Sequence, residues 1–464
     1  MRTAIRTAAT SVAFIVFVAM AGRIGFAGDQ ARKAPAGVLA IVPFQQEAGN
    51  IAYSLAQGKG FSAVFRADTG PTAWLAPVYP LLLAGIFKIF GSFTAQAFFA
   101  AVSLNILFSS AACVPVFFAG KRVGGLGLAS LGAWLWALFP NALVVPFEWI
   151  WDTSLSALLV ATILWATLAL AESERVLHWC SYGLLWGFAL MTNPALGAAL
   201  PFLLAWLSCQ GRRSSHPKLA DSDRLESRST AANRELDRSV PRWNRAALAA
   251  GVALLCCVPW TIRNYTTFHR FIPLRSNLPF ELWIGNNDIF DEHARNGRKL
   301  ITRTEEARTY AQHGETAYMQ EKWRLATSFM ASHPGLELRL AGRKFAAFWT
   351  GMDSPLKTFL ETDSVLVRGI LLCSFLTAIG ALFGILALWW RRSEVTFPLA
   401  VFPVIYPCLY YVTHADLRYR HPIDPVLCLL TAVAAASAWE LARRKGHSEA
   451  GESTGADGPH KTLT

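Results

Sequence analysis

The stretch TAQAFFAAVSLNILFSSAACVPVFFA, residues 94–119, contains no charged side chain. A helix of this length rises far enough to cross the ~30 Å hydrocarbon core of a bilayer, and residues 150–171 and 369–390 are long and apolar enough to do the same. Of the 464 residues, 53% are hydrophobic and 16% are charged, whereas soluble domains have about 25% charged residues. We therefore predict an all-α polytopic membrane protein.

The apolar runs predict a bundle of about ten transmembrane helices. They lie near 7–27, 94–119, 125–141, 150–171, 178–192, 194–208, 246–262, 369–390, 396–413 and 422–442. If both termini are cytoplasmic, each basic cluster that flanks a span falls on the cytoplasmic side. The net charge of +12 is therefore attributed to membrane topology, and nucleic acid is not an expected partner. The first span also resembles a secretory signal peptide, and we favour a retained helix.

These spans divide the chain into four predicted regions. They are an N-terminal transmembrane region (1–263, with a first outer loop 28–93 and a cytoplasmic loop 209–245), an extracytoplasmic region (264–366), C-terminal transmembrane helices (367–445) and a disordered cytoplasmic tail (446–464). Helical periodicity is present in the extracytoplasmic region on both sides of His333-Pro334. We expect its helices to lie on the membrane surface.

The first outer loop contains FQQEAGNIAYSLAQGKGF, residues 44–61, in which Glu47 is the only acid. Its periodicity predicts an amphipathic helix that ends at Gly58 and Gly60 and lies flat on the membrane surface. In projection Glu47 lies on the seam between the apolar and polar faces, where partial desolvation would raise its pKa. The alternative is an ordinary surface acid. A second helix, at 77–90, is too short to span and is predicted to be interfacial or re-entrant.

Ionisable side chains gather where the spans end on the outer side. They are Glu148 and Asp152 before the fourth span, Arg263 and Arg275 around the end of the seventh, and His414, Asp416, Arg418, Arg420 and His421 between the last two. Arginine binds phosphate bidentately, and a carboxylate can deprotonate a hydroxyl or hold a divalent ion. Together they predict a site for a phosphorylated lipid. Taken singly, each could instead be an interfacial anchor or part of a salt bridge.

Five stretches, in order along the chain, resemble the GT-C superfamily of membrane glycosyltransferases. They are EAGNIAYSLAQGKGFS (47–62), PTAWLAPVYPLLLAGIFKIFG (71–91), GLLWGFALMTNPALGAALP (183–201), PWTIRNY with FIPLRSN and LWIGNN (259–287), and THADLRYRHPIDP (413–425). The resemblance is greatest to bacterial family 39 enzymes, relatives of protein O-mannosyltransferases and aminoarabinose transferases. It implies a bacterial inner-membrane enzyme that transfers a sugar, with inversion, from a polyprenyl-phosphate donor to a protein, lipid or polysaccharide acceptor on the outer face.

The resemblance also implies roles for single residues. Glu47 resembles the base or acceptor-orienting acid of the first loop, and Asp152 resembles a second acid near the outer end of a later span. Arg418, Arg420 and Arg263 resemble residues that bind the lipid phosphate. Further candidates for substrate contact are His414, Asp416, Arg275 and Glu148. Many relatives carry an Asp-Glu pair where this chain has Gln46-Glu47, so binding of a divalent metal ion stays open.

Two rival functions remain at this stage. A transporter or flippase of lipid-linked sugars would use the same arginines without forming a glycosidic bond. A surface-polysaccharide polymerase or ligase would use a pyrophosphate-linked donor. The chain contains no P-loop, dinucleotide-binding, zinc-protease or serine-hydrolase motif, so ATP-driven transport by this chain alone is not expected.

Overall fold

The computed structural model describes most of the chain, in six ranges: 9–35, 37–65, 68–213, 242–287, 304–351 and 359–454. These ranges are helical and contain no β-strand, only an isolated bridge between Ser62 and Pro71. Most of the predicted cytoplasmic loop (209–245) and the end of the predicted tail (455–464) lie outside the described residues.

The first part of the chain forms helices in the predicted first outer loop (28–93) and in the first spans. They are α2 (Val12–Lys33), α3 (Val38–Ile41), a 3-10 turn (Val42–Phe44), α4 (Glu47–Ala56), α5 (Val78–Phe90), α6 (Ala95–Ala111), α7 (Cys113–Ala137), α8 (Pro140–Glu148), α9 (Thr153–Leu170), α10 (Val176–Thr192), a 3-10 helix (Pro194–Ala199), α11 (Leu200–Arg213) and α13 (Arg242–Phe268).

The second part adds the helices of the predicted outer region and the last spans. They are α14 (Leu278–Gly285), α17 (Thr304–Ser332), α18 (Pro334–Thr350), α20 (Val365–Trp390), α21 (Thr396–Ile405), α22 (Cys408–Val412), α23 (Leu417–Arg420), a 3-10 turn (His421–Ile423) and α24 (Asp424–Thr454). The boundary between α17 and α18 falls at His333-Pro334, as predicted. The last helix continues into residues 446–454, where the sequence predicts a disordered tail.

The chain is an all-α polytopic membrane protein. Six helices in the described ranges are long and apolar enough to cross a bilayer, and 78–90, 194–210 and 396–412 form shorter apolar helices. One of the six, residues 95–137, contains two passes of the chain. The backbone is non-helical at Gly124 and Gly125 (φ +79°), and a Cβ on Gly120 would lie 2.8 Å from the Cα of Ala129. The chain therefore reverses here, between the predicted spans 94–119 and 125–141.

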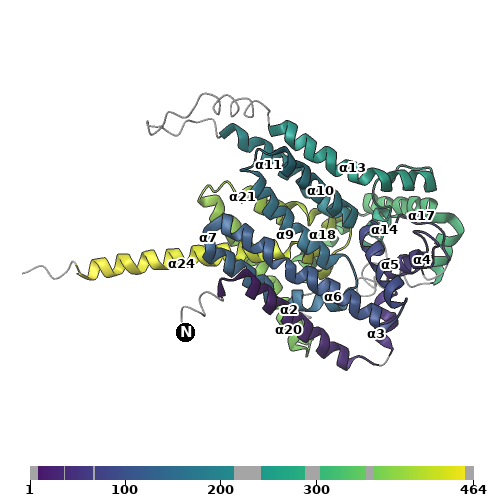
Figure 1. Cartoon of the computed structure of the whole chain (residues 1–464), viewed down its shortest axis with the longest axis horizontal. Coiled ribbons are helices and arrows are strands. Elements are labelled where there is room, and N and C mark those ends of the chain that lie inside the picture. The colour runs from purple at the N-terminus through teal and green to yellow at the C-terminus, as the bar shows by residue number, and fades with distance from the viewer. Residues whose placement is uncertain are drawn as a thin grey trace, which may run out of the picture.

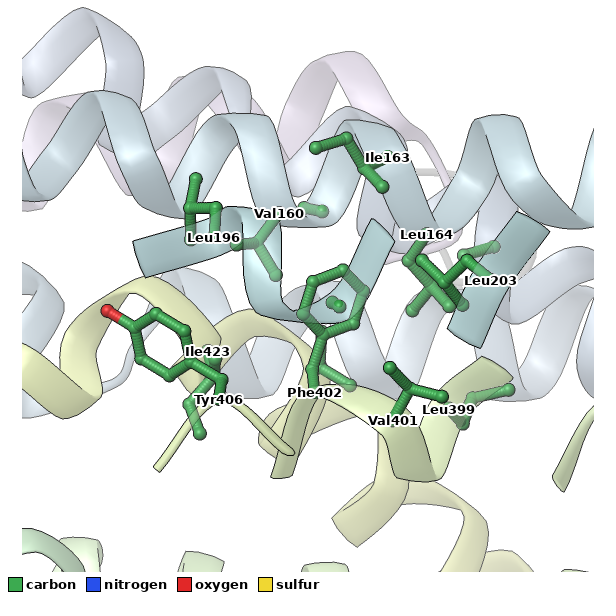
Figure 2. Packing of buried hydrophobic residues seen from close by; sticks show 14 of the residues in the cluster. Val160, Ile163, Leu164, Leu196, Leu203, Leu399, Val401, Phe402, Tyr406 and Ile423 are labelled. Carbon is green, nitrogen blue, oxygen red and sulfur yellow. The ribbon is translucent and has the colours of Figure 1, made fainter. Parts of the chain in front are cut away.

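The largest buried apolar cluster joins helices from both halves of the sequence. Figure 2 shows Val160 of α9 and Leu196 of the 3-10 helix on one side of this cluster, with Val401 and Phe402 of α21 on the other. Lipid tails are as apolar as leucine, so within the bilayer such a cluster is stabilised by close packing more than by the exclusion of water. This packing fixes the spans that hold the functional site.

A buried arginine ties the first span into the bundle. Arg23 of α2 donates to Ser109 Oγ of α6 (2.9 Å) and to the carbonyl oxygens of Ala137 (3.1 Å) and Trp136 (3.4 Å). These carbonyls are at the C-terminus of α7, where a cation is favourable because the last carbonyls of a helix have no intrahelical donor. The charge thus has hydrogen-bond partners although it is fully buried.

The loop helices cover one end of the bundle. In Figure 1, α4, α5, α14 and α17 gather at this end, and α24 extends from the opposite end. The segment 61–75 is fixed here from two sides. Arg263 of α13 donates to the carbonyl oxygens of Phe61 (2.8 Å) and Thr72 (2.7 Å). Glu315 of α17 accepts from Ala73 N (2.8 Å) and from the Thr72 hydroxyl.

Helix α4 confirms the predicted helix and its end before the glycines, but Asn50 and Ser54 of its polar face are buried, while Tyr53 is exposed. Asn50 Nδ2 donates to the carbonyl oxygen of Val64 (3.0 Å), and the hydroxyls of Ser54 and Ser62 lie 2.6 Å apart. A helical projection cannot show that residues 61–65 fold back over this face. Glu47 is buried within the protein, more deeply than the partial desolvation that its place in the helical projection predicts.

Candidate functional site

A cavity of 350 Å³ lies where α4 and α14 meet the loops that precede α9 and α24. Its wall contains three tryptophans, three tyrosines and an unusual number of ionisable groups. The ionisable residues are Glu47, Asp152, Arg275, Glu281, His414, Asp416 and Arg418. Six of these seven were predicted from the sequence. Concave sites with a few convergent polar groups are typical of ligand-binding and catalytic sites.

Glu47 is the first residue of α4, and its side chain is 5% exposed. It forms no ion pair and no hydrogen bond with another side chain in the described part of the chain. Burial raises the pKa of its carboxyl to about 7, and its own backbone N–H and the charge of Arg418 only partly oppose this shift. A carboxyl with a pKa near neutrality is well suited to act as a general base.

Glu281 in the first turn of α14 is a second, partly buried carboxylate. It accepts a hydrogen bond from Asn277 Nδ2 (2.8 Å), and its Oε2 lies 3.2 Å from His414 Nδ1. Burial raises the pKa of Glu281, but His414, Arg275 and Arg418 outweigh burial and lower the pKa below its usual value. Two carboxyl groups of one cavity thus have pKa values shifted in opposite directions, an arrangement typical of enzymes that separate acid and base roles.

Sequence reasoning missed Glu281, although the available signal was a lone acid in the apolar stretch LPFELWIG (278–285). Its partner His414 was predicted from the sequence. His414 belongs to a loop that is more than a hundred residues away in the sequence, so only the tertiary structure shows that the two side chains meet.

Arg418 is presented to the cavity by the short helix α23. Asp416 caps this helix by accepting from the backbone N–H of Arg418 (3.0 Å). The guanidinium lies over the rings of Trp149 (4.6 Å) and Tyr419 (4.7 Å), and Nη2 donates to the Tyr419 hydroxyl (2.8 Å). Its Nε is buried and has no hydrogen-bond partner among the described residues. A buried N–H without a partner is costly, which indicates a place for an anionic ligand.

Arg275 and Asp152 add charge to the same wall. The Arg275 guanidinium forms no hydrogen bond or ion pair with any residue in the described ranges. Asp152 is the N-cap residue of α9, and its Oδ2 accepts from Ser156 Oγ (3.2 Å). Ser156 Oγ in turn accepts from Asn193 Nδ2 (3.4 Å), so the break at Asn193-Pro194 contributes to the orientation of this acid. The cavity therefore presents two guanidinium groups and several carboxylates to one space.

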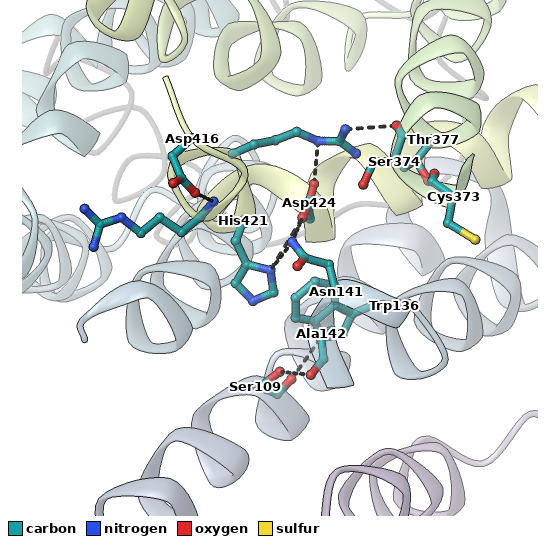
Figure 3. A network of polar contacts seen from close by, with 12 residues as sticks. Ser109, Trp136, Asn141, Ala142, Cys373, Ser374, Thr377, Asp416, His421 and Asp424 are labelled. Atoms are coloured by element: carbon teal, nitrogen blue, oxygen red, sulfur yellow. Dashed lines mark hydrogen bonds and ion pairs between the residues drawn. The ribbon is translucent and has the colours of Figure 1, made fainter. Parts of the chain in front are cut away.

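Arg420 does not line this cavity, which contradicts its predicted contact with a lipid phosphate. Its side chain is fully buried, and Nε donates to Asp424 Oδ1 (2.8 Å) while Nη1 donates to the carbonyl oxygens of Trp349 (2.7 Å) and Ser374 (2.9 Å). Figure 3 shows His421 and Asn141 pointing toward Asp424. We call Asn141, Arg420, His421 and Asp424 the buried polar node.

Two further predicted contacts are also absent from the cavity wall. Arg263 binds the carbonyl oxygens of residues 61 and 72 and stacks on Trp260 (5.0 Å), so it holds the segment that carries Trp74 of the wall. Glu148 is exposed at the end of α8. Their sequence positions near the predicted outer ends of the spans do not bring them to the cavity wall.

The described residues contain no group of three or more His, Cys, Asp or Glu side chains that could hold a metal ion. The carboxylates of the cavity are distributed around its wall instead. The divalent ion that the sequence leaves open therefore has no matching ligand set in the part of the chain that the structure describes.

Comparisons with known proteins identify a similar fold among solved structures. No protein-family model and no curated protein matches the chain. The crystal structure of the apo oligosaccharyltransferase of Archaeoglobus fulgidus is similar with a TM-score of 0.50 at 12% identity, over 98% of this chain and 53% of that one. The oligosaccharyltransferase AglB of the same organism, in complex with an inhibitory peptide and a dolichol-phosphate, gives 0.51 at 12% identity, over 97% and 52%.

The chain thus spans about half the length of these archaeal enzymes. Oligosaccharyltransferases have the GT-C fold, and the fold of this chain is of the same kind. At this identity the similarity shows the fold alone, and it agrees with the fold that the sequence stretches imply.

Proposed function

We propose that the chain is an integral membrane glycosyltransferase of the GT-C kind, of the bacterial family 39 type. It transfers a sugar from a polyprenyl-phosphate donor to an acceptor on the outer face of the membrane, with inversion. One observation carries the proposal: the buried carboxylate of Glu47, which has no partner among the described side chains, shares a cavity with the guanidinium groups of Arg275 and Arg418. The dolichol-phosphate bound to the archaeal AglB is consistent with a lipid-phosphate donor.

The reaction is a single in-line displacement. Glu47 takes the proton of the acceptor hydroxyl as the oxygen forms a bond to the anomeric carbon. The bond from that carbon to the phosphate oxygen breaks, and its electron pair goes to the departing polyprenyl phosphate. Arg418 and Arg275 stabilise the negative charge that develops on this leaving group, in a site where water is largely excluded. One displacement inverts the anomeric centre.

The other residues of the wall orient the substrates. Asp152 accepts hydrogen bonds from sugar hydroxyls and is itself oriented by Ser156. Trp151, which is half-buried in the wall, offers a flat apolar surface on which a sugar ring can stack. No step is assigned to a metal ion, because the described residues lack a fitting ligand set.

The rival functions explain less of this wall. A flippase of lipid-linked sugars needs the two arginines but has no use for a buried carboxyl with a pKa near 7. A polymerase or ligase would bind a pyrophosphate-linked donor. The donor assay below separates both from the proposal.

The test is transfer by purified protein in lipid nanodiscs, with radiolabelled polyprenyl-phosphate sugars and a panel of protein, lipid and polysaccharide acceptors. We expect a new glycosidic bond with wild type and a rate ~10²–10⁴-fold lower with Glu47→Gln, because the general base is lost. Glu321→Gln, in a surface ion pair with Arg324, is the matched control and should keep the wild-type rate. Equal rates for wild type and Glu47→Gln would show that Glu47 is not the general base. Movement of donor across the bilayer without bond formation would support the flippase.

A further inference from the structure

Four side chains along one wall of the cavity form a continuous series of polar contacts. Glu281 Oε2 lies 3.2 Å from His414 Nδ1. His414 Nε2 lies 3.1 Å from the Tyr419 hydroxyl, which accepts from Arg418 Nη2 at 2.8 Å. The series runs from α14 to α23 and ends on the guanidinium that faces the cavity.

The Glu281–His414 contact is an ion-pair distance without hydrogen-bond alignment, whereas the two contacts of the Tyr419 hydroxyl are hydrogen bonds. The Glu281 carboxylate can only accept, so it selects the His414 tautomer with the proton on Nδ1. The Nε2 lone pair then accepts the proton of the Tyr419 hydroxyl. The oxygen of Tyr419 is left with its lone pairs toward Arg418, whose guanidinium can only donate. The negative charge of Glu281 thus favours the His414 tautomer that orients the two hydrogen bonds of Tyr419 up to the arginine.

Glu281 and His414, the first two members of the series, are held together by contacts between α14 and the loop that carries His414. Asn286, which follows α14, donates from Nδ2 to the carbonyl oxygen of Val412 (2.9 Å). The buried Lys344 of α18 donates to Asn286 Oδ1 (2.5 Å) and to the same carbonyl oxygen (3.1 Å). Gly285 lies directly against the carbonyl oxygen of Thr413, where a Cβ would collide. The helix that carries Glu281 is therefore fixed to the loop that carries His414.

We propose that Glu281, His414 and Tyr419 are positioning residues that hold the Arg418 guanidinium in the orientation that binds the phosphate of the donor. An unrestrained arginine loses side-chain entropy when it binds a ligand, and holding it in place beforehand removes this cost. The arrangement leaves the unpartnered Nε–H of Arg418 available to an oxyanion. The inference rests on the proposed function, in which Arg418 contacts the donor phosphate.

The test measures binding of a polyprenyl phosphate without sugar to the full-length protein in nanodiscs. We expect Tyr419→Phe and Glu281→Gln each to weaken binding ~10-fold, the usual size for loss of a hydrogen bond to a charged group. In the Arg418→Ala background, neither substitution should weaken binding further, because each acts through that arginine. Tyr182→Phe is the matched control. It removes a buried hydroxyl that bonds to Thr167 (2.7 Å), far from the cavity wall, and should leave binding unchanged.

The outcomes separate the inference from the proposed function. If Arg418→Ala weakens binding but Tyr419→Phe and Glu281→Gln do not, or if their effects persist in the Arg418→Ala background, the positioning role is wrong and the phosphate site stands. If Arg418→Ala itself binds like wild type, the donor-phosphate assignment is wrong and the inference falls with it. A rise in donor KM with little change in kcat for Tyr419→Phe would support positioning. The midpoint of thermal unfolding shows whether each variant is folded. If Glu281→Gln is misfolded, the binding result for Tyr419→Phe decides the test.

Discussion

Arg418 and Arg420 are two residues apart in one loop, yet their surroundings differ. Arg420 is fully buried with Asp424 and two backbone carbonyls as partners, so its charge is compensated within the protein. Arg418 has aromatic rings and one hydroxyl around it, has no carboxylate at ion-pair distance among the described residues, and lines the cavity.

The same contrast holds between the two regions as wholes. In the buried polar node, acids and bases face each other at hydrogen-bond distance, as in a structural ion pair. In the cavity, Glu47 and Arg275 face open space without a partner among the described residues. Uncompensated charge is unfavourable for stability, and natural proteins retain it where a ligand supplies the missing partner. Substitutions in the node should therefore reduce stability, and substitutions in the cavity should reduce binding and rate.

The largest effect is expected in the buried polar node. Asp424→Ala leaves the guanidinium of Arg420 buried without its counter-charge, which should lower the free energy of unfolding by ~3–5 kcal/mol. The midpoint of thermal unfolding in nanodiscs measures this. The double variant Arg420→Met with Asp424→Leu removes both charges and should be more stable than Asp424→Ala. A single variant as stable as wild type would show that the node is not structural.

Arg418→Ala should show the opposite pattern. The transfer rate should fall ~10²–10³-fold, the usual cost of removing one group that stabilises developing charge, while the thermal midpoint stays near that of wild type. Arg391→Ala, which breaks a half-exposed ion pair with Glu440, is a control that should change neither quantity. A large loss of stability in Arg418→Ala would contradict the claim that Arg420 stabilises the fold and Arg418 does not.

The raised pKa of Glu47 predicts how stability depends on pH. The folded protein binds this proton more tightly than the unfolded chain does, since the pKa rises from 4.5 to about 7. The free energy of unfolding therefore falls as the pH increases from about 4.5 to about 7, by ~3 kcal/mol for this group. Glu47→Gln should remove this loss and raise the thermal midpoint at pH 8 above that of wild type. An unchanged or lower midpoint would mean that Glu47 is paired in the folded protein.

A smaller effect is expected at Gly285, which packs α14 against the loop that carries His414. An added methyl group would meet the carbonyl oxygen of Thr413, so Gly285→Ala should cost ~1–3 kcal/mol of stability and raise the donor KM by displacing His414. Gly251→Ala in α13 is the matched control, because nothing lies within 4 Å of the added atom. That substitution should be neutral or slightly stabilising. Equal effects at the two glycines would show that the contact with Thr413 does not position the wall.

The sequence predicts the fold class well because its signals are local. Runs of apolar residues gave the spans, the glycines after α4 gave the end of that helix, and the Asn193-Pro194 break is present. The position of α4 was not predictable in this way. Its amphipathic pattern resembles a helix at a lipid surface, and its burial depends on a segment that folds back over its polar face.

The candidate site was predicted in part for the same reason. Residue type and position near the outer ends of the spans led to Glu47, Asp152 and Arg418, which the structure brings into one cavity. The same criteria also selected Arg263 and Arg420, because a one-dimensional pattern does not reveal whether an arginine already has partners. Only contacts between distant segments separate the arginines that line the wall from those that stabilise the fold.

The central claim is that Glu47 acts as the base of a transfer reaction in this cavity. The most direct test is the pH dependence of kcat/KM for sugar transfer, which reports the ionisation of the free enzyme. Below a pH of about 7 the value should rise about tenfold per pH unit, because the base must be ionised, and above it the value should level off. In Glu47→Gln this rise of kcat/KM with pH should disappear, together with most of the activity. A rise of kcat/KM with pH that persists in Glu47→Gln, or one that levels off near pH 4.5, would contradict the account.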